Sequence, residues 1–205
     1  MLQTTDRQRK IILIAAWVAA LDCLLVALLF SLIQVSIPGS TLASIWPIPA
    51  LYFFEIAALA VLAITAVPYL TSPNKGAWLP FPWIAAGIMT AFVILGAFSI
   101  GLFLVPALLS FMLMAVQVQA SSSQNEPLNQ FAYLLLSLFV LVLVIMGTWS
   151  LASPMTIAVL LTGIVLLLFA NTHLPQNSIW KDLTFFFIGG CAQTLLMYLL
   201  LQPHL

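Results

Sequence analysis

The chain has 205 residues, of which 64% are hydrophobic and only 5% are charged, and its formal net charge is zero. A soluble domain carries about a quarter charged residues, so this composition excludes an ordinary water-soluble fold and makes lipid the expected solvent for most of the surface. The zero net charge also gives no electrostatic reason to expect nucleic acid as a partner.

The apolar runs of the sequence are continuous and have the length of membrane-spanning helices. A helix needs about 20 apolar residues to cross a hydrocarbon core of about 30 Å. A closed β-barrel also pairs all its backbone groups, but its strands alternate apolar and polar residues over about ten positions. The runs here do not alternate. The sequence therefore predicts an all-α, polytopic transmembrane helical bundle.

The first two expected spans cover residues 11–35 and 49–69. The first follows the basic segment RQRK and so resembles a signal peptide. Its apolar stretch is longer than the 7–15 residues of a signal-peptide core, and it contains Asp22. We therefore expect it to remain in the protein as a membrane span. The second span contains the other intramembrane acid, Glu55.

A long apolar block at residues 80–118 follows. As one helix it would be about 58 Å long, nearly twice the hydrocarbon thickness. The block is expected to form two spans, 80–97 and 100–118, joined by a tight turn that two glycines make possible. One tilted helix, or one kinked at Pro106, is the competing interpretation.

A polar segment at residues 119–129 is expected to be a linker between a four-helix and a three-helix part of one transmembrane domain. Three spans are predicted beyond it, at 130–150, 154–171 and 181–202. Prolines such as Pro80 and Pro154 stand at or just before expected helix starts, where the missing N–H is harmless.

The basic residues favour seven spans with a cytoplasmic N-terminus. With seven spans, all of them lie on the cytoplasmic side: Arg7, Arg9, Lys10, Lys75 and Lys181. With six spans, the alternative, Lys181 would face outward. Membrane proteins concentrate Lys and Arg in their cytoplasmic loops, so the seven-span topology is preferred.

Asp22 and Glu55 are the candidate intramembrane polar or ion site. A carboxylate at the centre of a span costs about 2.5–3.5 kcal/mol on insertion scales. Small or apolar residues share a helical face with each acid, which indicates that both acids face protein: Ala15 and Ala19 for Asp22, and Ala58, Leu62 and Ala66 for Glu55. The acids are interpreted as a proton or cation site, as groups protonated or hydrogen-bonded to a neighbouring helix, or as contacts to a partner subunit.

The last expected helix contains the run Gly189-Gly190-Cys191-Ala192-Gln193. This run is a candidate for either ligand contact or close helix packing, with Gln193 bonded across an interface in the second case. Packing is the preferred interpretation. Tyr198 lies near the outer end of the helix and is expected to be an interfacial anchor.

The sequence contains none of the common enzyme motifs. The H-E-x-x-H, P-loop, G-x-S-x-G and Cys-x-x-Cys patterns are all missing. The two cysteines have no metal-ligand spacing, and neither histidine is expected at membrane depth. We therefore predict no catalytic residue and no metal site, and the sequence identifies no cofactor.

The expected function is that of a non-enzymatic, membrane-embedded subunit of a larger complex, with lipid and other membrane proteins as partners. The alternative is a small-solute or proton-coupled transporter, or a substrate-binding membrane component, with its site near Asp22 and Glu55. The pairs Ala15-x-x-x-Ala19 and Ala16-x-x-x-Ala20 resemble the docking faces of the substrate-capture subunits of energy-coupling-factor vitamin transporters. That resemblance covers this short motif alone, and those subunits usually have six helices. Loops without disulfides favour a prokaryotic inner membrane.

Overall fold

The computed structural model describes residues 6–36, 48–72, 78–95, 101–120, 154–174 and 179–201. These ranges contain helices and no strand, which confirms the all-α prediction for this part of the chain. The helices are α1 (Asp6–Ser36), α3 (Ile48–Leu70), α4 (Pro80–Leu95), the 3₁₀-helix η1 (Gly101–Leu104), α5 (Val105–Ala120), α7 (Pro154–His173) and α8 (Ile179–Leu201). The predicted span at 130–150 lies outside the described residues.

Four described helices are long and apolar enough to cross a membrane. Their apolar stretches are Asp6–Leu32, Phe53–Leu70, Gly101–Gln119 and Ile179–Leu199. The apolar stretches Pro80–Leu95 in α4 and Leu160–Phe169 in α7 are shorter. The described helices are therefore compatible with an integral membrane protein, and four of them qualify as candidate spans.

The apolar block at 80–118 divides into two helices, α4 and α5, and of the two predicted spans only the second corresponds to a candidate span, Gly101–Gln119. Helix α5 is preceded directly by η1, so Pro106 falls in the first turn of α5. Proline is tolerated in a first turn because the N–H groups there have no intrahelical acceptor. Pro106 therefore stands near a helix start and does not kink one long helix.

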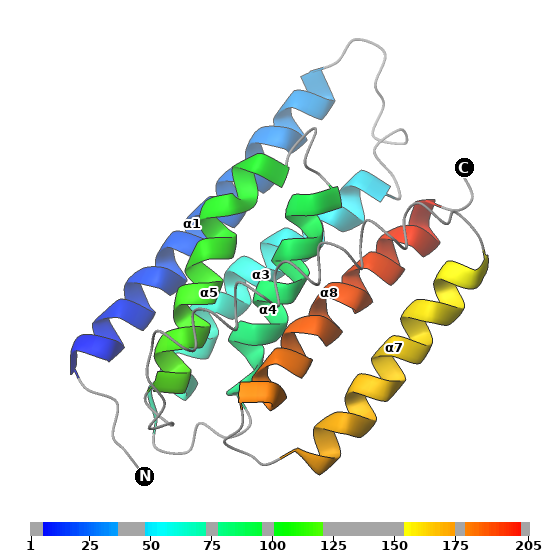
Figure 1. The fold of residues 1–205 in the computed structure, drawn as a ribbon. Helices are drawn as coiled ribbons and strands as arrows, with labels where there is room; N and C mark the ends of the chain where they lie inside the picture. Colours follow the sequence, from blue (N-terminus) through cyan, green and yellow to red (C-terminus); the bar gives the residue numbers. More distant parts are fainter. Residues whose placement is uncertain are drawn as a thin grey trace.

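The helices form a bundle in which α1 and α8 have different neighbours. Helix α1 packs against α3 and α5, whereas α8 packs against α4 and α7. Helices α4 and α5 also contact each other and so connect these two groups. In Figure 1, α1 lies at one side of the bundle and α7 at the opposite side.

The interior is lined by small residues on one side of α1, where Ala16, Ala19 and Cys23 are 0% exposed. Small side chains let transmembrane helices approach closely, which explains why α3 and α5 both pack on this face. The opposite side of α1 carries large apolar residues, with Leu21 60% and Leu28 63% exposed. Large apolar side chains on the outside and small ones inside suit a helix whose outer face contacts lipid.

Candidate functional site

Asp22 of α1 is bonded to the backbone at the start of α5. Its Oδ2 accepts a hydrogen bond from the backbone N–H of Ala107 at 3.0 Å. Asp22 is partly buried, and Ala107 is 0% exposed. The carboxyl group of one helix therefore serves as an N-terminal cap for another.

The local sequence of α5 explains why this amide needs an external acceptor. The first N–H groups of an α-helix have no acceptor within the helix, and Pro106 has no N–H at all. Ala107 is the third residue of α5, and the 3₁₀-helix η1 directly precedes α5. An unpaired N–H in the hydrocarbon region costs several kcal/mol, and an acidic group is favourable at a helix N-terminus. Asp22 satisfies both requirements.

An aromatic contact joins α1 to the segment formed by η1 and α5 at a second position along α1. The rings of Phe30 in α1 and Phe103 in η1 meet edge to face, with centroids 5.7 Å apart. Residue numbers rise along α1 and fall along the η1–α5 segment between the two contacts, so the helices are antiparallel. The bond from Asp22 to Ala107 thus lies within a packed helix pair.

Glu55 of α3 is bonded to a different helix, α8. The side-chain amide Nε2 of Gln193 donates to Oε2 of Glu55 at 2.9 Å. Gln193 is only 5% exposed. The contacts of α3 are mainly with α1, so this hydrogen bond is a polar bridge between the two helix groups.

The helical face predicted for Glu55 is partly wrong. Ala66 is 0% exposed, but Leu62 is 40% exposed and Ala58 is also exposed. The buried face of α3 instead contains Ile56 and Ala63, both 0% exposed. This face is centred about one residue further along the chain, because α3 packs on α1 through its alanines. Glu55 therefore lies at the edge of the buried face.

The two acids have separate partners. Among the hydrogen bonds of the described residues, none joins Asp22 to Glu55: Asp22 contacts α5 and Glu55 contacts α8. Within the same part of the chain, no group of three or more His, Cys, Asp and Glu side chains is placed to hold a metal ion. Chemically, each acid is an acceptor that joins two helices.

Gly189 and Gly190 of α8 lie where the backbones of α8 and α4 are close together. A Cβ atom on Gly189 would overlap the carbonyl oxygen of Ile84, and a Cβ on Gly87 of α4 would overlap that of Phe186. The backbone N of Gly190 also lies within reach of that second position. The backbones of α4 and α8 therefore lie close together at this crossing.

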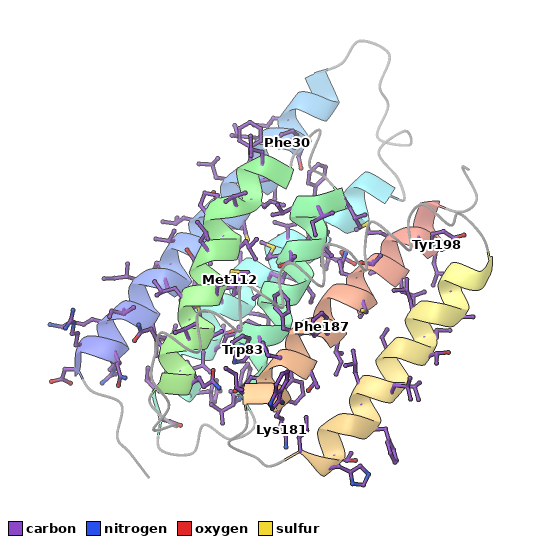
Figure 2. All side chains as sticks on the ribbon, viewed as in Figure 1. Phe30, Trp83, Met112, Lys181, Phe187 and Tyr198 are labelled. Carbon is purple, nitrogen blue, oxygen red and sulfur yellow. The ribbon has the colours of Figure 1, made fainter. Side chains whose placement is uncertain are left out.

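The polar residues that follow these glycines also lie inside the bundle. The hydroxyl of Thr194 donates to the carbonyl oxygen of Gly190 at 2.8 Å. Tyr198 is only 5% exposed, so its side chain packs among the helices near the end of α8, and its role as an interfacial anchor stays a prediction. Figure 2 shows Tyr198 at the upper part of α8.

Two contacts at these positions were not found from the sequence: the Ala107 amide and the close approach at Gly87. Pro106 is a usable signal for the first, because a proline in an intramembrane first turn implies an amide without a helical acceptor. No signal in the sequence identifies Asp22 as the acceptor, since 85 residues separate the two groups.

No protein-family model matches the chain, and no curated protein or solved structure is significantly similar to it.

Proposed function

We propose that this chain is a multi-pass integral membrane protein that serves as a non-enzymatic subunit of a larger membrane complex. The observation that carries the proposal is the use of both intramembrane acids in joining helices. Asp22 accepts from α5 and Glu55 accepts from α8, at 3.0 and 2.9 Å. Polar groups committed to such bonds stabilise a fixed bundle, and a fixed bundle suits a structural subunit.

The outer surface of the bundle supports the same proposal. Helix α7 packs mainly against α8, and its other side exposes Val165 and Leu166, each 62% exposed. This surface is available to lipid or to neighbouring membrane subunits. The alanine pairs of α1, by contrast, are at most 2% exposed and already pack within the chain. They are not free to dock a partner in the way that the resemblance to vitamin-transporter subunits implies.

The proposal includes seven spans and a cytoplasmic N-terminus. In Figure 1 α1, α4 and α8 run toward one end of the bundle, and α3, α5 and α7 run toward the other, so the direction alternates along the described helices except from α5 to α7. Helix α5 ends at the end of the bundle where α7 also ends, so α7 begins at the opposite end. The chain must therefore cross the bundle once between α5 and α7, which fits a span at 130–150.

The basic residues gather at one end of the bundle, which supports the orientation. Arg9 and Lys10 lie in the first turns of α1, and Lys181 lies at the start of α8, at the same end in Figure 2. Helix α3 ends and α4 begins at that end as well, and Lys75 lies between them in the sequence. Positive residues mark the cytoplasmic side. A prokaryotic inner membrane is the proposed location.

Reporter fusions test the topology. Alkaline phosphatase is active only outside the cytoplasm, and green fluorescent protein is fluorescent mainly inside it. With seven spans, a C-terminal phosphatase fusion is active and the matched fluorescent fusion is dark. The opposite pattern from the C-terminal pair would refute the odd number of spans. Fusions after Ser72, which lies at the basic end, serve as the control and should give the cytoplasmic pattern.

Purification from the native membrane tests the subunit proposal. The tagged chain, extracted in a mild nonionic detergent, is expected to co-purify with other membrane proteins in constant ratio across independent preparations. Light scattering after size-exclusion chromatography then gives the mass of the assembly. A stable monomer that binds a small solute would overturn the proposal.

The alternative function, a transporter or solute-binding component, is favoured by one observation: both acids are only partly buried. A proton or cation site at Asp22 or Glu55 requires an ionisable group. Asp22→Asn and Glu55→Gln keep the shape and an acceptor oxygen but do not ionise. Loss of ion-dependent uptake in these variants, with assembly unchanged, would favour transport.

A further inference from the structure

The N-terminal end of α1 carries a surface hollow lined by Asp6, Arg9, Lys10 and Leu13. Arg9 and Lys10 are exposed, and within the described ranges neither forms an ion pair. Two cations and one carboxylate leave the hollow with a net positive charge. Side chains bearing nitrogen extend outward from this end of α1 in Figure 2. The hollow is therefore suited to an anion.

An exposed apolar stripe rises from the hollow along the same side of α1. Leu13, Trp17 and Leu21 are 42%, 48% and 60% exposed. Offsets of three, four and seven residues return to one side of a helix, so these side chains continue the line that begins at Lys10. Trp17 lies about 10 Å along the axis from Lys10. A free anion would match only the hollow, whereas an amphiphile matches both the hollow and the stripe.

We infer that the N-terminal end of α1 binds an anionic phospholipid. The phosphate lies at Arg9 and Lys10, and an acyl chain lies along Leu13, Trp17 and Leu21. The inference rests on the membrane-spanning role of α1 proposed above. Basic pockets at the cytoplasmic ends of transmembrane helices recognise lipid headgroups through this combination of charge and apolar contact.

Asp6 narrows the choice of headgroup. Its carboxylate lines the hollow beside the two cations and accepts hydrogen bonds but donates none. A headgroup that combines a phosphate with a hydroxyl donor complements all three charged side chains. Phosphatidylglycerol has this combination, because its phosphate carries the negative charge and its glycerol carries two hydroxyl groups.

Fluorescence quenching by brominated lipids tests the inference on the full chain. The protein is reconstituted into phosphatidylcholine vesicles that contain either dibrominated phosphatidylglycerol or dibrominated phosphatidylcholine. The signal of Trp17 is obtained by subtracting the spectrum of Trp17→Phe. We expect the brominated phosphatidylglycerol to quench Trp17 preferentially. Each charge removed in Arg9→Gln and Lys10→Gln is expected to lower that preference by about fivefold at low ionic strength.

Arg7→Gln is the matched control. Arg7 is exposed in the first turns of α1, but it does not line the hollow. A general attraction between the basic terminus and the membrane surface would weaken equally in Arg7→Gln, and that result would overturn the inference. Equal quenching by both brominated lipids would overturn it as well, as would loss of the preference on adding inorganic phosphate. Extraction with alkaline carbonate separately shows whether the chain is inserted in the membrane. A failure of the membrane proposal can therefore be distinguished from a failure of the lipid-binding inference.

Discussion

Replacement of Asp22 tests whether this acid caps α5 or carries a proton. In Asp22→Ala the amide of Ala107 loses the acceptor that lies 3.0 Å away in the native protein. In Asp22→Asn the side-chain oxygen remains in place and can still accept the bond. The capping interpretation therefore predicts that Asn preserves stability and Ala lowers it.

The magnitude follows from two opposing contributions. Hydrogen bonds between transmembrane helices contribute about 0.6 kcal/mol on average and up to about 1.7 kcal/mol, and a buried donor without a partner costs about 1–3 kcal/mol. Removing a carboxylate from the membrane recovers about 2.5–3.5 kcal/mol of insertion cost. That recovery is largely the same in the folded state and in a state unfolded within a micelle. The cancellation leaves an expected loss of about 1–2 kcal/mol for Asp22→Ala and less than about 0.5 kcal/mol for Asp22→Asn.

Unfolding in mixed detergent micelles measures these values. The free thiol of Cys23 provides the signal, because Cys23 is 0% exposed and should react with a maleimide only after the bundle opens. Asp22→Asn serves as the shape-matched control, because the Asn side chain keeps an acceptor oxygen. Equal destabilisation by Asn and Ala would show that the charge itself matters, and an unaffected Ala variant would refute the capping role.

Further predictions concern the other contacts between helices. Gly189→Ala should destabilise the bundle by about 1–3 kcal/mol, because the added Cβ meets a backbone carbonyl; Gly163→Ala is the control, since a Cβ at that position meets no atom within 4 Å. Gln193→Leu should cost about 0.6–1.7 kcal/mol through loss of the bond to Glu55, whereas Glu55→Gln keeps an acceptor and should change stability less. The stability of each variant and its control can be measured in the same micelle assay. Equal destabilisation by a variant and its control would contradict the contact assigned to that position. Maleimide should label Cys191 only on unfolding, since it is 6% exposed; rapid labelling of the folded protein would contradict its packing.

Helix positions were predictable because they depend on local properties of the chain. Pro80 and Pro154 stand at the first residues of α4 and α7, as their missing N–H groups require. The inward face of α1 was also predictable, because Ala15 and Ala19 repeat at helical spacing and are 2% and 0% exposed. Both features follow from interactions within a few residues.

The partners of the two acids were not predictable in the same way. They depend on which helices become neighbours, and 85 and 138 residues separate the bonded groups. Glu55 was identified as an acid at membrane depth and Gln193 as the amide that follows two glycines, but their pairing required the fold. The exposure of Leu62 shows the same limit, since helical spacing defines a face but does not say which face a neighbour covers.

The large sequence separation of the two polar bonds has a consequence for biosynthesis. A ribosome that adds about 5–20 residues per second reaches Ala107 roughly 4–17 s after Asp22, given their separation of 85 residues. During that interval, the carboxyl group of Asp22 has no donor from Ala107. Glu55 of α3 lacks its donor Gln193 for even longer. We expect the early helices to remain beside the insertion machinery, or to be held by a chaperone, until α5 and α8 emerge. The bond of Asp22 can therefore close only after about half of the chain has been made, and the bond of Glu55 only near the end of synthesis.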